Sequence, residues 1–161
     1  MAQAWEALQK EGIPLVSNQV RYSLLDRKIE TNGIMDTAKE LGISIIAYSP
    51  LAQGLVTGKF HDNPALIKNL GYRRYMPAFN SNGLKKSKPV VDLVKTLAQK
   101  YQVTTSQIAL NWLIHYHGET VLAIPGATKE SHALENAGTL KFRLSPEDLT
   151  LLHEASKVFL V

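Results

Sequence analysis

The chain has 161 residues, of which 45% are apolar and 20% are charged. This balance allows one ordinary globular domain with a buried core and argues against disorder. The net charge of +4 comes from 18 basic and 14 acidic residues, spread along the chain with one short cluster at Lys85, Lys86 and Lys88. Nucleic-acid-binding surfaces usually gather their basic residues on one face, so this dispersed charge argues against a nucleic-acid partner, while it suits a small anionic ligand.

Cysteine is absent from the sequence, and so are apolar runs long enough for a membrane span. The lack of cysteine excludes a disulfide framework, a thiolate metal site and a cysteine nucleophile. A bilayer-spanning helix needs about 20 consecutive apolar residues, and residues 1–10 have the pattern of an amphipathic helix instead of a signal peptide. The expectation is a cytoplasmic protein with no membrane partner.

Short apolar runs alternate with stretches of helical spacing in the first third of the chain. Residues 2–10 are predicted to be a helix, 15–20 a strand, 30–41 a helix and 43–48 a second strand. The second of these helices ends before Gly42, a residue typical of helix C-termini. The strand that follows is rich in β-branched residues and is closed by Pro50.

The next stretch, residues 51–89, is rich in glycine, proline and polar turn residues, which predicts a long connecting loop. Loops of this length inside a compact domain are usually functional. The lysine cluster at residues 85–88 is predicted to belong to this solvated loop. Two helices follow over residues 90–101 and 105–117, and Thr104 with Gln107 forms the pattern of a capping box between them.

The last third of the chain predicts a third strand over residues 120–125 and two closing helices over 129–140 and 146–158, the second of which starts at Ser145-Pro146. Strands separated by crossovers of ten or more residues form parallel sheets. The near-continuous apolar sequences of these strands predict a sheet that is buried on both faces. Three parallel strands leave two open edges, so the sequence also predicts self-association or a partner chain that covers them.

Polar residues and glycines gather where each predicted strand ends. The segments concerned are Asn18-Gln19, Tyr48-Ser49-Pro50 and Pro125-Gly126, and a predicted helix starts soon after the last of them. In parallel α/β folds, ligands bind at the C-terminal ends of the strands. An aromatic ring, amides and a helix N-terminus gathered there suit a ligand with a flat ring and phosphates.

These segments resemble the aldo-keto reductases in order and spacing. The matching motifs are Asn18-Gln19-Val20, Ala47-Tyr48-Ser49-Pro50-Leu51 with Gly54 and Gly58-Lys59-Phe60, and Ile124-Pro125-Gly126-Ala127 with Glu135-Asn136. The resemblance covers nearly the whole chain and implies an α/β fold, part of a (β/α)8 TIM barrel. Residues 1–161 would then form a single C-terminal half-barrel with the sixth to eighth strands. The Gly-Ala and Gly-Lys-Phe steps are most similar to the branch of bacterial and plant reductases and potassium-channel β subunits.

The resemblance implies NADP(H) as the cofactor. Tyr48 would stack on the nicotinamide ring, and Gln19 would hold its carboxamide. The residues implied around the pyrophosphate are Ser49, Pro50, Leu51, Gln53, Gly54, Lys59 and Gly126. The residues implied around the adenine and its 2′-phosphate are Arg73, Thr128, His132, Glu135 and Asn136, with His132 in a position where relatives often carry Arg or Gln.

The family's proton donor, a tyrosine, and its supporting Asp, Lys and His belong to the second, third and fourth barrel strands, upstream of this sequence. Carbonyl reduction needs a proton donor as well as a hydride. The resemblance therefore implies a truncated NADP(H)-linked oxidoreductase, with no catalytic residue in this chain. It would act on a small carbonyl substrate only when completed by the other half. The alternative is a non-catalytic nucleotide-binding or assembly module.

Each candidate residue also has a purely structural interpretation. Tyr48 alone is equally typical of a half-buried aromatic at a strand end, and Gly126 alone is typical of a turn. The histidines at positions 115, 117 and 132 have no neighbouring carboxylate residue at the spacing of metal ligands. They are therefore predicted to lie on helix surfaces, and no metal site is expected. The combination of three polar strand ends is what favours a ligand.

Overall fold

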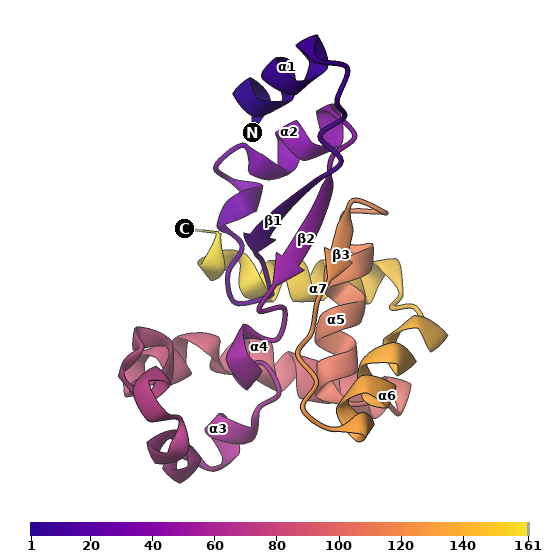
Figure 1. The fold of residues 1–161 in the computed structure, drawn as a ribbon. Coiled ribbons are helices and arrows are strands. Elements are labelled where there is room, and N and C mark those ends of the chain that lie inside the picture. The colour runs from indigo at the N-terminus through magenta and orange to yellow at the C-terminus, as the bar shows by residue number, and fades with distance from the viewer. Residues whose placement is uncertain (161) are drawn as a thin grey trace.

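The computed structural model describes residues 1–160 and contains one parallel sheet of three strands. The strands are β1 (Ser17–Arg21), β2 (Ser44–Tyr48) and β3 (Val121–Ala123), in the spatial order β1-β2-β3 (Figure 1). Ser17 pairs with Ser44, and Ile45 pairs with Val121. The predicted parallel arrangement is confirmed, and the sheet is open, with β1 and β3 as its outer strands.

Helices precede the first strand, connect the strands and follow the last of them. They are α1 (Ala2–Lys10), α2 (Ile34–Glu40), α3 (Lys59–Asp62), α4 (Ser81–Tyr101), α5 (Thr105–His115), α6 (Glu130–Gly138) and α7 (Pro146–Ser156). The predicted capping box is present at the start of α5. The Thr104 hydroxyl accepts a hydrogen bond from the Gln107 N–H at 3.2 Å, and the Gln107 side chain accepts one from the Thr104 N–H at 3.0 Å. Ser145 caps α7 through the N–H of Asp148.

The connection between β2 and α4 differs from the predicted loop. Residues 51–80 contain α3 and several short 3-10 turns, and α4 begins at Ser81 instead of residue 90. Asn80 explains the early start, because its side-chain oxygen accepts a hydrogen bond from the Gly83 N–H at 2.8 Å and caps the helix. The prediction was wrong because it took Pro89 as a boundary, whereas Pro89 lies on an exposed position inside α4. The lysine cluster at 85–88 is therefore helical.

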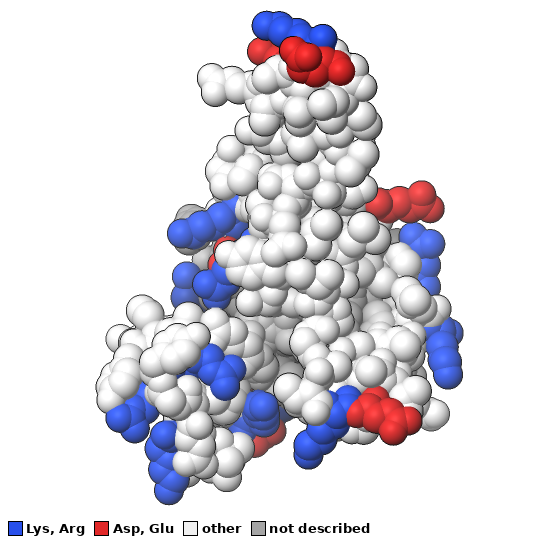
Figure 2. All heavy atoms as spheres, in the orientation of Figure 1, with Lys and Arg blue, Asp and Glu red and all other residues white. Residues whose placement is uncertain are grey.

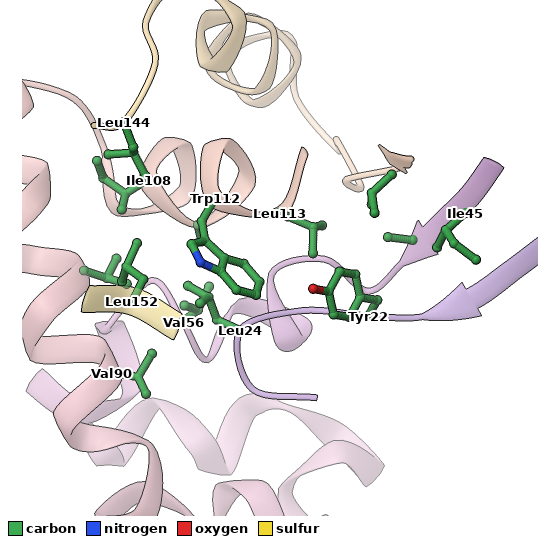
Figure 3. Close-up of a cluster of buried hydrophobic side chains, with 14 of the residues drawn as sticks. Tyr22, Leu24, Ile45, Val56, Val90, Ile108, Trp112, Leu113, Leu144 and Leu152 are labelled. Atoms are coloured by element: carbon green, nitrogen blue, oxygen red, sulfur yellow. The ribbon is translucent and has the colours of Figure 1, made fainter. Parts of the chain in front are cut away.

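One face of the sheet carries the hydrophobic core. Ile45 and Ala47 of β2 and Val121 of β3 are buried there. Ile45 belongs to one cluster with Trp112 and Leu113 of α5 (Figure 3). Side chains of α2, α4 and α7 belong to the same cluster. The core thus joins the sheet to helices from both halves of the chain.

The opposite face of the sheet is open. Side chains alternate between the two faces of a strand, and on this face Tyr48 exposes 41% of its surface, Leu122 55% and Ile124 47%. The prediction of a sheet buried on both faces was wrong, because the helices of the chain cover only the core face. Contiguous exposed apolar surface is typical of a face that meets another molecule.

A buried arginine joins the segment after β1 to the C-terminal helix. Arg27 is fully buried, and its guanidinium donates to both carboxylate oxygens of Glu30, at 2.7 and 2.6 Å. It also donates to the His153 carbonyl and the Ser156 hydroxyl of α7, each at 2.8 Å. The Tyr22 hydroxyl donates to the same carboxylate at 2.7 Å. Bidentate Arg–carboxylate pairs combine strength with fixed geometry, so this cluster holds α7 in place against the start of the chain.

Candidate functional site

A groove lies at the C-terminal ends of β2 and β3. Its volume is about 510 Å³, and it is bordered by the loop after β2, the segment after β3, α6 and the start of α5. Figure 2 shows the surface hollowed between the lobe that carries α3 and the one that carries α6, with Lys and Arg side chains on either side. Twelve of the fourteen predicted cofactor-binding residues line the groove: Ser49, Pro50, Leu51, Gln53, Gly54, Lys59, Arg73, Gly126, Thr128, His132, Glu135 and Asn136.

The other two predicted residues, Gln19 and Tyr48, lie on the open face of the sheet. Gln19 pairs with Ile46, two residues before Tyr48, so both side chains leave the same face. Ser49, the residue after Tyr48, already lines the groove. The predicted contacts to the ring and to the phosphates therefore adjoin, although they do not share one cavity.

The loop after β2 has a strained backbone. Ser49, Ala52 and Gln53 have φ values of 51°, 48° and 56°, in the left-handed region that residues other than glycine rarely occupy. Such conformations cost about 1–3 kcal/mol each and are concentrated at functional sites. The Oε1 atom of Gln53 is also buried without a hydrogen-bond partner within residues 1–160. The loop is thus held in a costly conformation and keeps one acceptor available.

Gly54 makes room for a lysine at the edge of the groove. Its φ is +86°, and a Cβ atom at this position would lie 3.3 Å from Cε of Lys59. The Lys59 ammonium lies 4.9 Å from the centre of the Phe60 ring. Glycine therefore allows both the left-handed turn and the close approach of the lysine stem to the loop.

The opposite wall is formed by α6 and the segment that precedes it. The Glu135 carboxylate accepts a hydrogen bond from the Thr104 hydroxyl at 2.6 Å, and its backbone carbonyl accepts one from the Gln107 side chain at 2.9 Å. The Thr128 hydroxyl lies 3.4 Å from Nδ1 of His132. The residues that cap α5 thus also fix Glu135, which stands in the groove as an oriented acceptor.

The charge of the groove is mostly positive. Lys59 and Arg73 line it from the lobe after β2, and Glu135 is the one carboxylate among the lining residues. The N-terminus of α6 adds the partial positive charge that every helix carries at this end. The groove therefore suits an elongated anionic ligand with a polar group near Glu135.

Four lining residues were not among the predicted ones: Thr57, Ser106, Ile124 and Pro125. The last two belong to the motif after β3 but were assigned to the strand itself. The Thr57 hydroxyl donates to the Gly54 carbonyl at 2.8 Å, and the Thr57 carbonyl accepts from the Thr105 hydroxyl at 3.1 Å. This docking of α5 on the loop brings Ser106 to the groove, and no local sequence signal could have indicated it.

The histidines do not form a metal site in the part of the chain that the structure describes. Among residues 1–160 no group of three or more His, Asp or Glu side chains could hold a metal ion. His117 departs from the prediction of a helix-surface position, because α5 ends at His115 and the His117 side chain is only 10% exposed, with Nε2 3.6 Å from Glu30. Within the same residues, no helix is both long enough and apolar enough to cross a membrane.

Comparison with known proteins identifies relatives along the whole chain. The aldo/keto reductase family model matches residues 1–157. Probable pyridoxal reductase 2 of Schizosaccharomyces pombe is 38% identical over 149 residues, which are 91% of this chain and 44% of that protein. Probable aldo-keto reductase 1 of Glycine max is 36% identical over 145 residues, 88% of this chain and 40% of that protein. Aldo-keto reductase str7 of Strobilurus tenacellus is 31% identical over 146 residues, 89% and 43% respectively.

A solved structure shares the fold. The crystal structure of the thermostable aldo-keto reductase Tm1743 with the inhibitor epalrestat aligns with a TM-score of 0.67 at 27% identity, and the match covers 93% of this chain and 43% of that one. The chain thus spans less than half the length of these relatives. Its three parallel strands and their helices are part of a (β/α)8 barrel whose sheet is not closed, and the chain belongs to the aldo/keto reductase family.

Proposed function

We propose that this chain is the C-terminal, NADP(H)-binding half of an aldo-keto reductase and that it contains none of the catalytic residues. Members of the family typically depend on NAD(P)H. The observation that carries the proposal is the groove, in which residues from the segments after β2 and after β3, both of which resemble the family's motifs, line one cavity. The same motifs support the sixth to eighth strands of the barrel and the branch of bacterial and plant reductases and potassium-channel β subunits.

The nicotinamide end of the cofactor is assigned to the strand ends. Tyr48, at the end of β2 on the open face, stacks on the ring, and Gln19 of the neighbouring strand holds the carboxamide. The strained loop that begins at Ser49 then wraps the pyrophosphate with its backbone. Lys59 neutralises part of the phosphate charge from the edge of the groove.

The adenine end is assigned to α6. Glu135 and Asn136 hold the base, while Thr128 and His132, together with Arg73 from the opposite lobe, face the 2′-phosphate. The opposing cation at Arg73 favours NADPH over NADH. At Gly126 no atom lies within 4 Å of the position that a Cβ would take, so the phosphates can approach the backbone there.

The residues of this chain bind and orient the cofactor, which when bound supplies the hydride. The developing alkoxide also needs a proton, and by resemblance to the family that proton comes from a tyrosine of the upstream strands. Tyr48 is occupied by stacking. A small-molecule carbonyl substrate is therefore reduced only when the other half of the barrel is present.

Titration with NADPH tests the proposal directly, with the emission of the cofactor as the signal. We expect a micromolar Kd, which corresponds to about −8 kcal/mol. Lys59→Gln is expected to raise this Kd about tenfold or more, because a hydrogen bond to a charged group contributes about 1.5–3 kcal/mol. Tyr48→Ala is expected to abolish measurable affinity at micromolar cofactor by removing the stacking surface.

Lys68→Gln is the matched control. Lys68 is an exposed lysine in the same lobe as Lys59 and does not line the groove, so its replacement should leave the Kd within twofold. Wild-type chain that binds no NADPH at millimolar concentration contradicts the proposal. If Lys59→Gln and Lys68→Gln weaken NADPH binding equally, the binding is explained by non-specific charge attraction.

The open sheet favours a second candidate function, a non-catalytic nucleotide-binding or assembly module with another polypeptide as its partner. On either side of β1, the Val16 carbonyl accepts a hydrogen bond from the Ser44 N–H of β2, and the Tyr22 N–H donates one to the Tyr48 carbonyl. The backbone groups of Ser17, Gln19 and Arg21 therefore point to the outer edge. Exposed Leu122 and Ile124 lie on the open face in and after β3, at the other side of the sheet. A second copy of the chain could cover such an edge and face.

Self-association is the test of this second function. We expect sedimentation equilibrium to show a dimer whose fraction rises with concentration, and Leu122→Lys to weaken the dimer at least tenfold by placing a charge on the apolar open face. Leu151→Lys serves as the control, because Leu151 is 51% exposed but lies on α7, away from the open face. A chain that stays monomeric at every concentration would contradict self-association through the open sheet.

A further inference from the structure

A second pocket lies on the other side of the strained loop from the groove. Its volume is about 360 Å³, and it is formed by that loop, the residues after β1, the start of α4 and Phe159 near the C-terminus. Its apolar lining includes Leu25, Leu55, Met76, Phe79 and Phe159. Pockets of this size and character hold small organic ligands. Gln53 is the one residue that lines both this pocket and the groove.

The charged residues that line the second pocket are all positive. Arg21 and Lys86 line it, and none of its lining residues is acidic. The Lys86 ammonium lies 4.8 Å from the centre of the Phe159 ring, so it is held at the mouth by a cation–π contact. Arg21 is already paired with Asp26 at 3.0 Å. Lys86 is therefore the cation best placed to meet a ligand.

The start of α4 adds to the positive potential. This helix runs for 21 residues without an acidic residue in its first turn, and Asn80, Asn82 and Gly83 at its N-terminus line the pocket. Asn80 caps only the Gly83 N–H, which leaves the earlier N–H groups of the helix for other acceptors. A helix of this length presents its positive end toward the pocket.

Gln53 adds a hydrogen-bond acceptor at the wall. Its Oε1 atom is buried, and within residues 1–160 it has no hydrogen-bond partner. A buried polar atom without a partner is costly, and a donor group on a ligand would satisfy it. Because a carboxylate has no hydrogen to donate, the charged group of an anionic ligand is placed away from this atom, toward Lys86 and the N-terminus of α4.

We propose that the second pocket binds a small amphipathic carboxylate. The ring or hydrocarbon part lies among Leu25, Phe79 and Phe159, and the carboxylate faces Lys86 and the N-terminus of α4. An apolar lining with the Lys86 ammonium and no acidic residue favours such an anion over a neutral or cationic ligand. This site goes beyond the proposed cofactor groove and does not depend on it.

Fluorine NMR with para-trifluoromethylbenzoate, in the absence of NADPH, tests this site. We expect line broadening that saturates with a Kd on the order of 1 mM or tighter, and at least tenfold weaker binding of para-trifluoromethylbenzyl alcohol, which lacks the charge. Lys86→Gln is expected to weaken benzoate binding about tenfold. Ala78→Leu, which places a larger side chain at a lining position, is expected to reduce binding while the chain remains folded by circular dichroism.

Two controls separate this site from other sources of binding. Lys85→Gln removes the neighbouring exposed lysine of α4, which does not line the pocket, and should change the Kd less than twofold. Lys59→Gln should also leave benzoate binding unchanged, which distinguishes the pocket from the cofactor groove, and Lys86→Gln should leave the NADPH Kd unchanged. Equal affinity for the neutral alcohol, or benzoate binding that survives Lys86→Gln, would overturn the proposal.

Discussion

Replacement of Arg27 by methionine is expected to lower the free energy of unfolding by about 3–5 kcal/mol. The substitution leaves the Glu30 carboxylate in a largely buried position without the guanidinium that neutralises it, and it also removes the hydrogen bonds to His153 and Ser156 of α7. Stabilities of natural domains are about 5–15 kcal/mol, so much of the total would be lost. Urea unfolding followed by Trp112 fluorescence measures the effect, because the guanidinium carbon lies 5.1 Å from this ring.

Arg74→Met is the control for this substitution. Arg74 is an exposed arginine that stacks on the neighbouring Tyr75 ring at 4.6 Å. Its replacement should change the free energy of unfolding by no more than about 0.5 kcal/mol. If both variants unfold at the wild-type urea concentration, the buried pair does not stabilise the fold as described.

The stability difference between the wild-type chain and Arg27→Met should also depend on pH. Burial alone would raise the pKa of Glu30, but hydrogen bonds from Arg27 and Tyr22, together with the nearby His117, lower it from 4.5 to about 2. As the pH is lowered, the Glu30 carboxylate is therefore protonated in the unfolded chain at a higher pH than in the folded chain. The stabilisation is fully present above pH 4.5 and is lost as the pH falls toward 2. In Arg27→Met this part of the acid dependence should shrink, because the main donor to the carboxylate is absent.

Fusion of this chain to the upstream part of a relative is expected to create carbonyl reduction that neither piece shows alone. Probable pyridoxal reductase 2 of Schizosaccharomyces pombe is a suitable donor, because this chain matches 44% of its length and the proposed function assigns the missing strands to the rest. The fusion would cover the open face of the sheet and provide a proton donor. General acid catalysis contributes about 100- to 10,000-fold to rates. The rate of carbonyl reduction by the fusion should therefore exceed that of the unfused chain by at least about 100-fold.

The measurement is consumption of NADPH with a panel of aliphatic and aromatic aldehydes. A fusion with Tyr48→Ala should need much more NADPH to reach half its maximal rate, which ties the activity to this chain's own residues. A fusion that folds and binds NADPH but reduces no aldehyde would contradict the half-reductase and favour the assembly module. Reduction by the unfused chain at the same rate would show that the upstream half is not needed.

The sequence predicts the elements that local patterns specify. β2 is a β-branched run that is soon followed by Pro50, and α5 begins after a capping box at Thr104, so both could be located from neighbouring residues alone. The start of α4 was misplaced because Pro89 usually marks a boundary, whereas here the Asn80 cap starts the helix earlier. The uncovered face could not be predicted either. Apolar residues on both sides of a strand indicate that both faces are buried in the complete barrel, but they do not indicate which face the helices of this chain cover.

The candidate site could likewise be predicted from the sequence only in part. Its polar strand ends could be predicted because consecutive parallel strands bring their C-terminal ends together. Ser106 could not, because only the packing of α5 on Thr57 places it in the groove. The second pocket joins Arg21 to Lys86 and Phe159 from distant parts of the chain, and no pattern of neighbouring residues encodes that meeting.

The position of Arg27 in the chain also sets the order of events during synthesis. Its partners His153 and Ser156 lie 126 and 129 residues further along. At about 5–20 residues per second, the ribosome needs roughly 6–25 seconds after Arg27 before these partners exist. During that interval the residues destined for the buried face of β1 and β2 have no C-terminal helix to pack on. The nascent chain therefore exposes this apolar surface until the residues of α7 have been synthesised.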